Sequence, residues 1–252
     1  MYNLKDAKLI VKREQKTFYR YKNSMIKVFE NTYAKSDICN EALNTARVEE
    51  TGLAVSALEC VVKIDGKWAL VTEYVAGETL ETLMKKHPER LEEYMEQFVD
   101  LQIEIHSKQC SLLRRLNGKL QRQINSLKMI DATTRYELLT RLEGMPKHNK
   151  LCHGDFNPSN VIVGEDGKMT VIDWSHATQG NASADAAMTY LMFALKNQKL
   201  ADLYLKEFCA KSDTARQYVQ KWIPIVAAAQ LTKNKELEKE FLMKWIDVMD
   251  FE

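Results

Sequence analysis

The sequence lacks the features that mark secreted, membrane-spanning or nucleic-acid-binding proteins. Its first residues, MYNLKDAKLIVKRE, contain no uninterrupted apolar segment and no cleavage site, so we expect no signal peptide. The longest apolar run, near residues 223–229, is too short to cross a bilayer. The formal net charge is only +1, which gives no electrostatic reason to expect nucleic acid or an anionic membrane as a partner.

Cysteine is scarce and follows no metal-binding or disulfide pattern. The chain has five cysteines and no C-x-x-C pair: Cys39, Cys60, Cys110, Cys152 and Cys209. An odd number of scattered cysteines is typical of reduced thiols, so we expect a cytoplasmic protein without a cysteine zinc site. Cys152 lies near the stretch described next, but no base or orienting group can be assigned to it, and we interpret it as a small buried residue.

What the sequence does contain is an ordinary globular composition and one unusual stretch. With 252 residues, 45% hydrophobic and 28% charged, the chain can form one large domain or two lobes. The unusual stretch is CHGDFNPSNVIVGEDGKMTVIDW, residues 152–174. Two apolar segments, 161–163 and 169–172, flank an Asp-Gly step, which predicts a hairpin. Closing this hairpin brings Asn160, at its entrance, opposite Asp173, at its exit.

The polar residues around this hairpin suit metal-assisted chemistry. Two converging oxygen donors, Asn160 and Asp173, suit a hard cation such as Mg²⁺, and Asp155 is a carboxylate just upstream that could act as a base. A purely structural interpretation would make Asp155 a turn former, Asn160 an Asx cap and Asp173 an exposed strand end. The joint occurrence of all three favours the chemical interpretation.

The spacing also matches a known template. In protein kinases a catalytic Asp precedes a metal-binding Asn in the pattern D-x-x-x-x-N, and a later Asp binds Mg²⁺. Asp155 and Asn160 have this spacing, although His153-Gly154-Asp155 stands in place of H-R-D and Asp173-Trp174 in place of D-F-G. His-Gly-Asp-x-x-x-x-Asn followed by Ile-Asp-Trp resembles the aminoglycoside phosphotransferase and choline kinase family of small-molecule kinases.

This resemblance implies roles for further residues. The cofactor would be Mg²⁺, the co-substrate ATP or GTP, and His153 would support the catalytic loop. Lys27 lies in an apolar strand where the template places the lysine that neutralises the α- and β-phosphates. Glu41 lies on or beside the apolar stripe of the helix predicted at 37–50, where a charge needs a partner. We predict that Glu41 pairs with Lys27; the alternative is a solvent-exposed helix glutamate.

The order of elements in the kinase template also assigns roles to two further segments. The segment that contains Glu73 and Val75 would be the hinge, whose backbone hydrogen-bonds the nucleotide base. The loop 13–17 departs from the protein-kinase pattern, because it contains no glycine with which to cover the phosphates. Whether Lys16 or Thr17 takes over this task is left open by the sequence.

The rest of the chain is predicted to be helical, with apolar stripes at about 89–110, 116–127, 133–143, 185–195, 203–208, 218–229 and 236–248. His106 is interpreted as a satisfied histidine at a helix end. Asp185 resembles a family residue that braces the catalytic loop through backbone contacts. The carboxylates of the last helix could bind a cationic substrate, but a solvated helix face is the favoured interpretation. They are Glu236, Glu238, Glu240, Asp247 and Asp250.

Together these patterns predict an α+β, bilobal, protein-kinase-like fold. Residues 1–74 would form a nucleotide-binding lobe with a sheet and one helix, and residues 75–252 a helical lobe with the catalytic loop and metal site. The predicted function is transfer of the γ-phosphoryl group of ATP or GTP to a hydroxyl of an amino sugar, sugar, choline-like or related metabolite. The alternatives are a catalytically weak, nucleotide-binding regulatory protein and a protein kinase. The acceptor, the nucleotide preference and the oligomeric state are not encoded in any pattern we recognise.

Overall fold

The strand-rich and helix-rich parts of the sequence form the α+β architecture that was predicted. The computed structural model describes residues 2–246. The strands are β1 (Lys8–Lys12), β2 (Lys16–Tyr21), β3 (Ser24–Phe29), β4 (Leu58–Ile64), β5 (Lys67–Glu73), β6 (Glu78–Thr79), β7 (Lys150–Cys152), β8 (Val161–Val163), β9 (Met169–Val171) and β10 (Thr178–Gly180). The α-helices are α1 (Lys35–Glu49), α2 (Leu80–Lys86), α3 (Leu91–Ser107), α4 (Leu116–Ser126), α5 (Ala132–Gly144), α6 (Ala182–Ala194), α7 (Gln198–Ser212), α8 (Arg216–Gln220), α9 (Ile223–Leu231) and α10 (Glu236–Met243).

The chain divides into two compact units that are not contiguous in sequence. The first contains the described residues up to Lys86 together with Pro158–His176. The second contains His87–Asn157 together with the described residues from Ala177 onward. The chain therefore passes from the second unit to the first within the predicted catalytic loop. The boundary predicted between residues 74 and 75 for two lobes stays a prediction.

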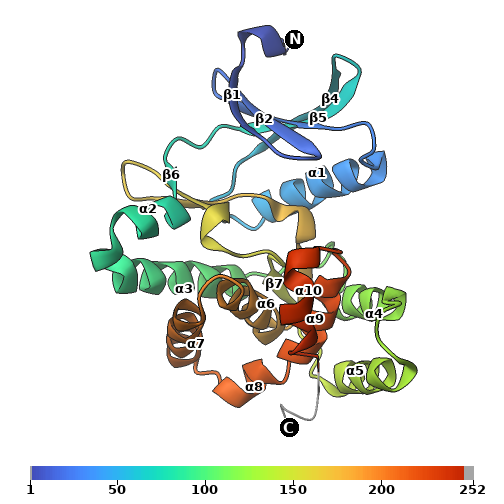
Figure 1. Ribbon diagram of the computed structural model, residues 1–252. Coiled ribbons are helices and arrows are strands. Elements are labelled where there is room, and N and C mark those ends of the chain that lie inside the picture. The colour runs from blue at the N-terminus through green and yellow to red at the C-terminus, as the bar shows by residue number, and fades with distance from the viewer. Residues whose placement is uncertain (1, 247–252) are drawn as a thin grey trace. The chain divides into compact units, whose positions relative to one another are not determined.

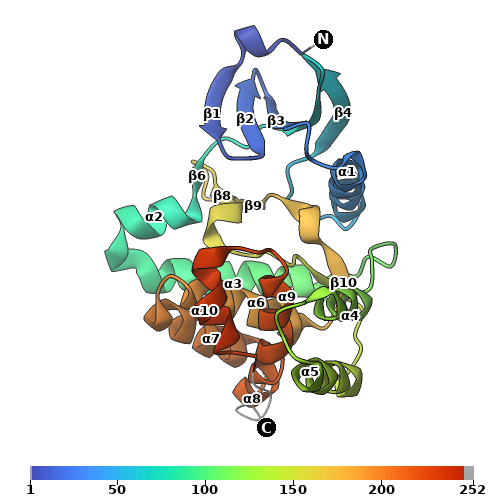
Figure 2. The same cartoon turned by 45° about the vertical axis from the view of Figure 1, so that its right-hand side comes forward.

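A five-stranded antiparallel sheet forms the centre of the first unit. Its strand order is β1-β2-β3-β5-β4, with β3 in the middle (Figure 2). β3 is rich in β-branched and aromatic residues, which favour strands, and Lys27 within it lies opposite Phe18 on β2 and Leu70 on β5. The register therefore fixes Lys27 in the interior of the sheet rather than at its edge.

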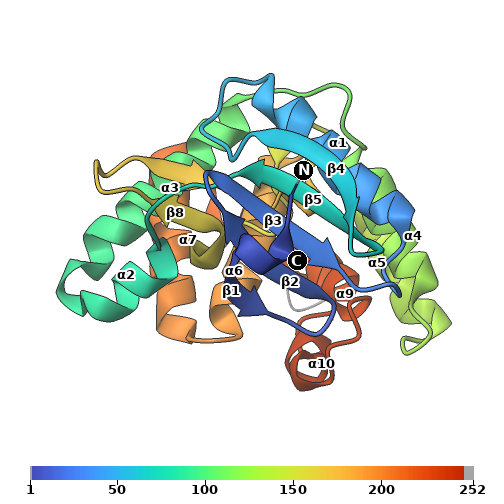
Figure 3. The same ribbon diagram turned by 90° about the horizontal axis from the view of Figure 1, so that it is seen from above.

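Helix α1 packs beside this sheet, next to β4 and β5 (Figures 1 and 3). Its apolar residues Ile38 and Ala42 join Phe29 and Leu70 of the sheet in one buried cluster. Asn44 ties the helix to a more distant segment, because its Nδ2 donates to the carbonyl oxygens of Trp174 and Ser175 at 3.4 and 3.3 Å. α1 thus connects the sheet with the segment that follows Asp173.

The predicted hairpin is present and belongs to the same unit. β8 pairs with β9 in antiparallel register, with Val161 opposite Val171, and β6 adds a third strand on the other side of β8. Gly77 permits this addition: its φ is +144°, and a Cβ there would lie 2.2 Å from the carbonyl oxygen of Val163. Only glycine allows so close an approach of two backbone segments.

The second unit is built of packed helices (Figure 1), and an aromatic cluster lies in its core. Phe98 of α3 is fully buried and stacks on Phe156 of the catalytic loop with ring centroids 4.3 Å apart. Phe193 of α6 and Tyr204 of α7 contact the Phe98 ring edge to face, with ring centroids 5.7 and 6.1 Å from its centroid. The core of this unit therefore supports the catalytic loop directly.

Two details of the helical part differ from prediction. The helix expected at 218–229 is two helices, α8 and α9, because Pro224 occupies the first turn of α9 and cannot continue a preceding helix. In α10, Leu237 falls within the apolar stripe expected at about 236–248 but is 99% exposed. α10 ends at Met243, and the predicted continuation through Asp247 and Val248, like Asp250, lies outside the described residues. Among residues 2–246, no helix is long and apolar enough to cross a membrane.

The aromatic core gives a stability prediction. Phe98→Ala removes a buried ring with three aromatic neighbours, so we expect the free energy of unfolding to fall by about 3–5 kcal/mol. Tyr136→Ala, which removes a ring that is 71% exposed, should change it by less than about 0.5 kcal/mol. Urea denaturation followed by circular dichroism measures both. Equal effects would show that the Phe98 cluster is not a core.

Candidate active site

Six residues predicted from the sequence line one pocket in the first unit. They are the four predicted cofactor-binding residues and the two predicted metal ligands: Lys27, Glu41, Glu73, Val75, Asn160 and Asp173. They come from β3, α1, the end of β5 and the segment after it, and the two ends of the β8–β9 hairpin. The fold therefore brings together segments separated by well over a hundred residues in sequence.

Lys27 is the buried cation of this pocket. Its Nζ lies 2.5 Å from Glu41 Oε1 and 3.5 Å from Asp173 Oδ1. Lys27 is 6% exposed and Glu41 3% exposed. Burial alone would lower the pKa of Lys27, but the two carboxylates outweigh it and raise that pKa above its usual value. The predicted Lys27–Glu41 ion pair is confirmed as a contact, and Asp173 is a second anion beside it.

Asp173 is held in an unusual conformation by its surroundings. Its φ is +63°, a left-handed backbone that non-glycine residues rarely adopt and that clusters at functional sites. Burial would raise the pKa of Asp173, but Lys27, then Lys16, outweigh it and hold that pKa well below its usual value. Asp173 therefore stays ionised and presents a fixed negative charge to the pocket.

Asn160 lies where the hairpin closes, as expected. Its carbonyl oxygen accepts a hydrogen bond from the Ile172 N–H at 2.9 Å, so the residue before Asp173 lies directly opposite Asn160. Both residues line the same pocket. The predicted geometry of the hairpin ends is thus present in the backbone.

The residues present fit a magnesium ion. Asp173 Oδ1 is buried beside Lys27 Nζ, at 3.5 Å, and accepts no hydrogen bond within residues 2–246, so this anionic oxygen can also bind a metal ion. No cluster of three or more His, Cys, Asp or Glu side chains is found in this described part. The donors present, the carboxylate of Asp173 and the amide of Asn160, suit Mg²⁺, which binds one or two protein oxygens and takes its remaining ligands from phosphates and water.

The expected hinge has one residue with open backbone groups. The N–H of Glu73 donates to Ala57 and its carbonyl accepts from Ser56 Oγ at 2.6 Å. Tyr74 N–H donates to Asn23. No such bond engages the backbone of Val75 within the described residues. If this segment binds a base through its backbone, Val75 rather than Glu73 offers the groups for it.

The glycine-free loop places two cations near the pocket. Arg13 lines the pocket with its guanidinium 5.3 Å from the centroid of the Phe18 ring. Lys16 Nζ lies 5.0 Å from the Tyr33 ring and 5.5 Å from the Phe29 ring. Burial and the neighbouring charge of Lys27 lower the pKa of Lys16. The loop that is rich in glycine in protein kinases therefore carries positively charged side chains in this chain.

The predicted catalytic loop begins in the second unit and is anchored by Asp185 of α6. Asp185 Oδ1 accepts from the Gly154 N–H at 2.7 Å, and Oδ2 accepts from the His153 N–H at 3.1 Å. His106 Nε2 lies 3.0 Å from the same Oδ2. Burial would raise the pKa of Asp185, but the hydrogen bonds from His106 and Gly154 and the nearby histidines together outweigh it and hold that pKa below its usual value. The bracing contacts expected of Asp185 are present.

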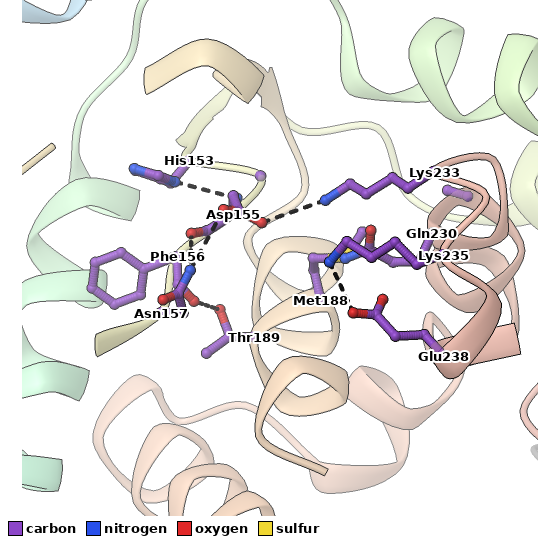
Figure 4. Close-up of polar contacts among 12 residues, drawn as sticks. His153, Asp155, Phe156, Asn157, Met188, Thr189, Gln230, Lys233, Lys235 and Glu238 are labelled. Atoms are coloured by element: carbon purple, nitrogen blue, oxygen red, sulfur yellow. Dashed lines mark hydrogen bonds and ion pairs between the residues drawn. The ribbon is translucent and has the colours of Figure 1, made fainter. Parts of the chain in front are cut away.

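The side chains of the loop orient Asp155. His153 is fully buried, and its Nδ1 accepts a hydrogen bond from the Asp155 N–H at 3.2 Å. Asn157 Nδ2 donates to the Asp155 carbonyl at 2.9 Å. The Asp155 carboxylate is about a quarter exposed, and Lys233 Nζ lies 3.4 Å from its Oδ1 (Figure 4). A supported, accessible carboxylate of this kind can orient a hydroxyl and accept its proton.

Comparisons with known proteins identify the family of this chain. A family model described as the phosphotransferase enzyme family matches residues 14–219. The chain belongs to this family. The match confirms the enzyme class predicted from the sequence, an ATP-dependent phosphotransferase with an alcohol group as acceptor. A comparison with curated proteins finds no match.

Solved structures share the fold of this phosphotransferase. A thermostable mutant of aminoglycoside phosphotransferase APH(4)-Ia, in a ternary complex with ADP and hygromycin B, has a TM-score of 0.71 at 13% identity, covering 96% of this chain and 90% of that one. Aminoglycoside-3'-phosphotransferase of type VIII has a TM-score of 0.64 at 17% identity, covering 90% and 93%. Choline kinase LicA from Streptococcus pneumoniae has a TM-score of 0.62 at 14% identity, covering 95% and 92%.

Some residues near the candidate site carried little or no sequence signal. Lys233 lies between α9 and α10 with no motif around it, and Arg13 belongs to the glycine-free loop, in which only Lys16 and Thr17 had been considered as candidates. His106 was interpreted as a satisfied helix-end residue, and its partner is the carboxylate of the residue that anchors the loop. Only the contacts of the folded chain connect these residues with the site.

The buried ion pair gives a pH-dependent prediction. Lys27→Met leaves Glu41 and Asp173 without their cation, so we expect the free energy of unfolding at pH 8 to fall by about 3–5 kcal/mol. Burial already raises the pKa of Glu41, and without Lys27 the pKa values of both Glu41 and Asp173 lie above their unfolded values. The folded variant binds more protons than the unfolded chain, and its stability falls as pH rises. The loss should therefore be smaller at pH 5 than at pH 8.

Urea denaturation at the two pH values measures this effect. Lys12→Met, which removes a lysine from the exposed strand β1, is the matched control and should change stability little at either pH. A loss that is the same at pH 5 and pH 8 would mean that the two acids are not coupled to Lys27.

Proposed function

We propose that this phosphotransferase is a small-molecule kinase that transfers the γ-phosphoryl group of ATP or GTP to a hydroxyl of an amino sugar, sugar, choline-like or related metabolite. The observation that carries the proposal is the pocket in which Lys27, paired with Glu41 and Asp173, meets Asn160. Two of the structural relatives are named for aminoglycosides and one for choline, which supports a small hydroxyl-bearing acceptor.

Each residue of the pocket has a role in the proposal. Lys27, fixed by Glu41, binds the α- and β-phosphates, and Asn160 and Asp173 hold Mg²⁺. Bound Mg²⁺ would supply charge neutralisation at the β- and γ-phosphates. Val75 binds the base through its open backbone groups, next to Glu73 in the hinge. Arg13 and Lys16 take the place of the glycine-rich loop, with side-chain charges instead of backbone N–H groups.

Asp155 performs the acid–base part of the reaction. It orients the acceptor hydroxyl and accepts its proton, while the hydroxyl oxygen forms a bond to the γ-phosphorus. The bond between that phosphorus and the β–γ bridging oxygen breaks, and the nucleoside diphosphate leaves with the electron pair. His153 and Asn157 hold Asp155 through its backbone N–H and carbonyl. Most of the rate comes from positioning and charge placement, since phosphoryl transfer needs little covalent chemistry from the protein.

A second candidate function is nucleotide binding without catalysis, as in a regulatory relative. The glycine-free loop favours it, because the phosphates lose the backbone donors that protein kinases supply. The supported carboxylate of Asp155 favours transfer, since a protein that only binds nucleotide needs no base there. A protein kinase is disfavoured by the missing H-R-D arginine and A-P-E segment.

Asp155→Asn tests the proposal. Loss of the base should lower kcat by at least about 100-fold. Affinity for the ATP analogue AMP-PNP should stay within about threefold, because Asp155 does not line the nucleotide pocket. Product formation is followed by mass spectrometry with cell metabolites, aminoglycosides and choline as acceptors, and affinity by calorimetry.

Asp65→Asn, in an exposed hairpin turn, is the matched control and should leave both quantities unchanged. Nucleotide binding without transfer to any acceptor by the wild-type protein would establish the regulatory function instead.

A further inference from the structure

The positive charge beside Asp155 comes from outside the catalytic loop. Residues 156–160 are Phe, Asn, Pro, Ser and Asn and contain no cation. Lys233, almost eighty residues further along the chain, supplies one: its Nζ lies 3.4 Å from Asp155 Oδ1. The two side chains are 27% and 28% exposed, so a molecule that enters from solvent can reach both. Figure 4 shows Lys233 extended from the α9–α10 connection toward Asp155.

The backbone at Lys233 is fixed from two sides. Lys233 N–H donates to the Gln230 carbonyl at 2.9 Å at the end of α9. Gln123 of α4 donates through Nε2 to Thr232 Oγ1 at 3.2 Å and to the Ala229 carbonyl at 3.3 Å. The lysine is therefore presented by an ordered turn, which lowers the entropy lost when its ammonium binds a ligand.

A second lysine of the same unit, Lys119, is influenced by the charges of Lys233 and Asp155. Lys119 is on α4, one turn before Gln123. Its pKa is lowered to about 8 by burial and by the positive charge of Lys233, while Asp185 and Asp155 act in the opposite direction. The repulsion between these two ammonium groups is reduced when an additional anion binds at Lys233.

The carboxylates of α10 form their ion pairs with lysines other than Lys233 and Lys119. Glu238 pairs with Lys235 at 2.8 Å (Figure 4). The other two acids of the helix, Glu236 and Glu240, pair with Lys239 at 3.8 Å and with Lys244 at 3.2 Å. The acids of α10 within the described residues are thus balanced by neighbours on or next to the same helix. This arrangement does not favour a cationic acceptor.

We propose that the acceptor carries an anionic group, a carboxylate or a phosphate, next to the hydroxyl that is phosphorylated, and that Lys233 binds this group. When the anion of the acceptor pairs with Lys233, the carboxylate of Asp155 is released to accept the hydroxyl proton. This inference rests on the proposed kinase function and narrows its acceptor class. Lys233 belongs to the unit that contains Asp155, whereas every residue that lines the nucleotide pocket belongs to the other.

The acceptor class is tested with the full-length enzyme, ATP and Mg²⁺. A cell metabolite extract is separated by ion exchange into anionic, neutral and cationic fractions, with glucuronate, glucose 6-phosphate, glucose and glucosamine as defined probes of each charge. New phosphate esters, identified by mass spectrometry, should arise from the anionic fraction. Glucuronate and glucose 6-phosphate separate a carboxylate from a phosphate requirement. Products from the neutral or cationic fraction alone would overturn the inference. No product in any fraction would instead contradict the kinase function itself.

The role of Lys233 is tested with the acceptor so identified. Lys233→Met should raise the KM for the acceptor about tenfold or more with kcat within about threefold, because a charge-assisted contact to the substrate is lost. Lys233→Arg keeps the charge and should restore most of the affinity. Lys244→Met, at an exposed ion pair of α10, should change neither constant. A loss of kcat at unchanged KM would place Lys233 on the transferred phosphoryl group and contradict an acceptor-binding role.

Discussion

The structure depends on a buried lysine held between two carboxylates. Lys27, Glu41 and Asp173 come from a central strand, a helix and a hairpin end, and they meet at 2.5 and 3.5 Å. Charges in a low-dielectric interior interact strongly, and an unpaired one is strongly destabilising. The three elements can therefore pack only with this geometry. The same constraint leaves a fixed cation and an ionised acid facing one pocket, which is what a triphosphate and a metal ion require.

The second unit orients Asp155, the carboxylate that we propose as the base. Asp185 accepts both backbone N–H groups at the start of the loop, and the stacked rings of Phe98 and Phe156 lie beneath it. A side chain supported in this way loses little entropy when a substrate binds. In our proposal the two units divide the work: one binds the nucleotide and metal, and the other binds and deprotonates the acceptor.

The sequence predicted those features whose signals are local. The Asp-Gly hairpin and the strand pattern around Lys27 each occupy a few consecutive residues, so turn chemistry and β propensity were enough. Glu41 could be predicted because a charge near an apolar stripe needs a partner. The family resemblance then supplied the remaining roles, and the match over residues 14–219 confirms the family.

Other features could not be read from the sequence because their causes are distant. Lys233 reaches Asp155 only through the packing of α9 against α4, and no motif surrounds it. Leu237 fits the periodicity of α10, yet that helix turns it to solvent, since periodicity cannot say which residues a neighbour covers. A single apolar pattern spans α8 and α9, and only Pro224 signals the break.

The central claim is that Asp173, fixed beside Lys27, holds a magnesium-bound nucleotide. Calorimetric titration of AMP-PNP with and without Mg²⁺, on wild type and Asp173→Asn, tests it most directly. We expect Mg²⁺ to tighten binding to the wild-type protein by about tenfold or more, and the variant to lose this Mg²⁺ dependence while it still binds the nucleotide weakly. An Mg²⁺ dependence that is the same in both proteins would contradict the account.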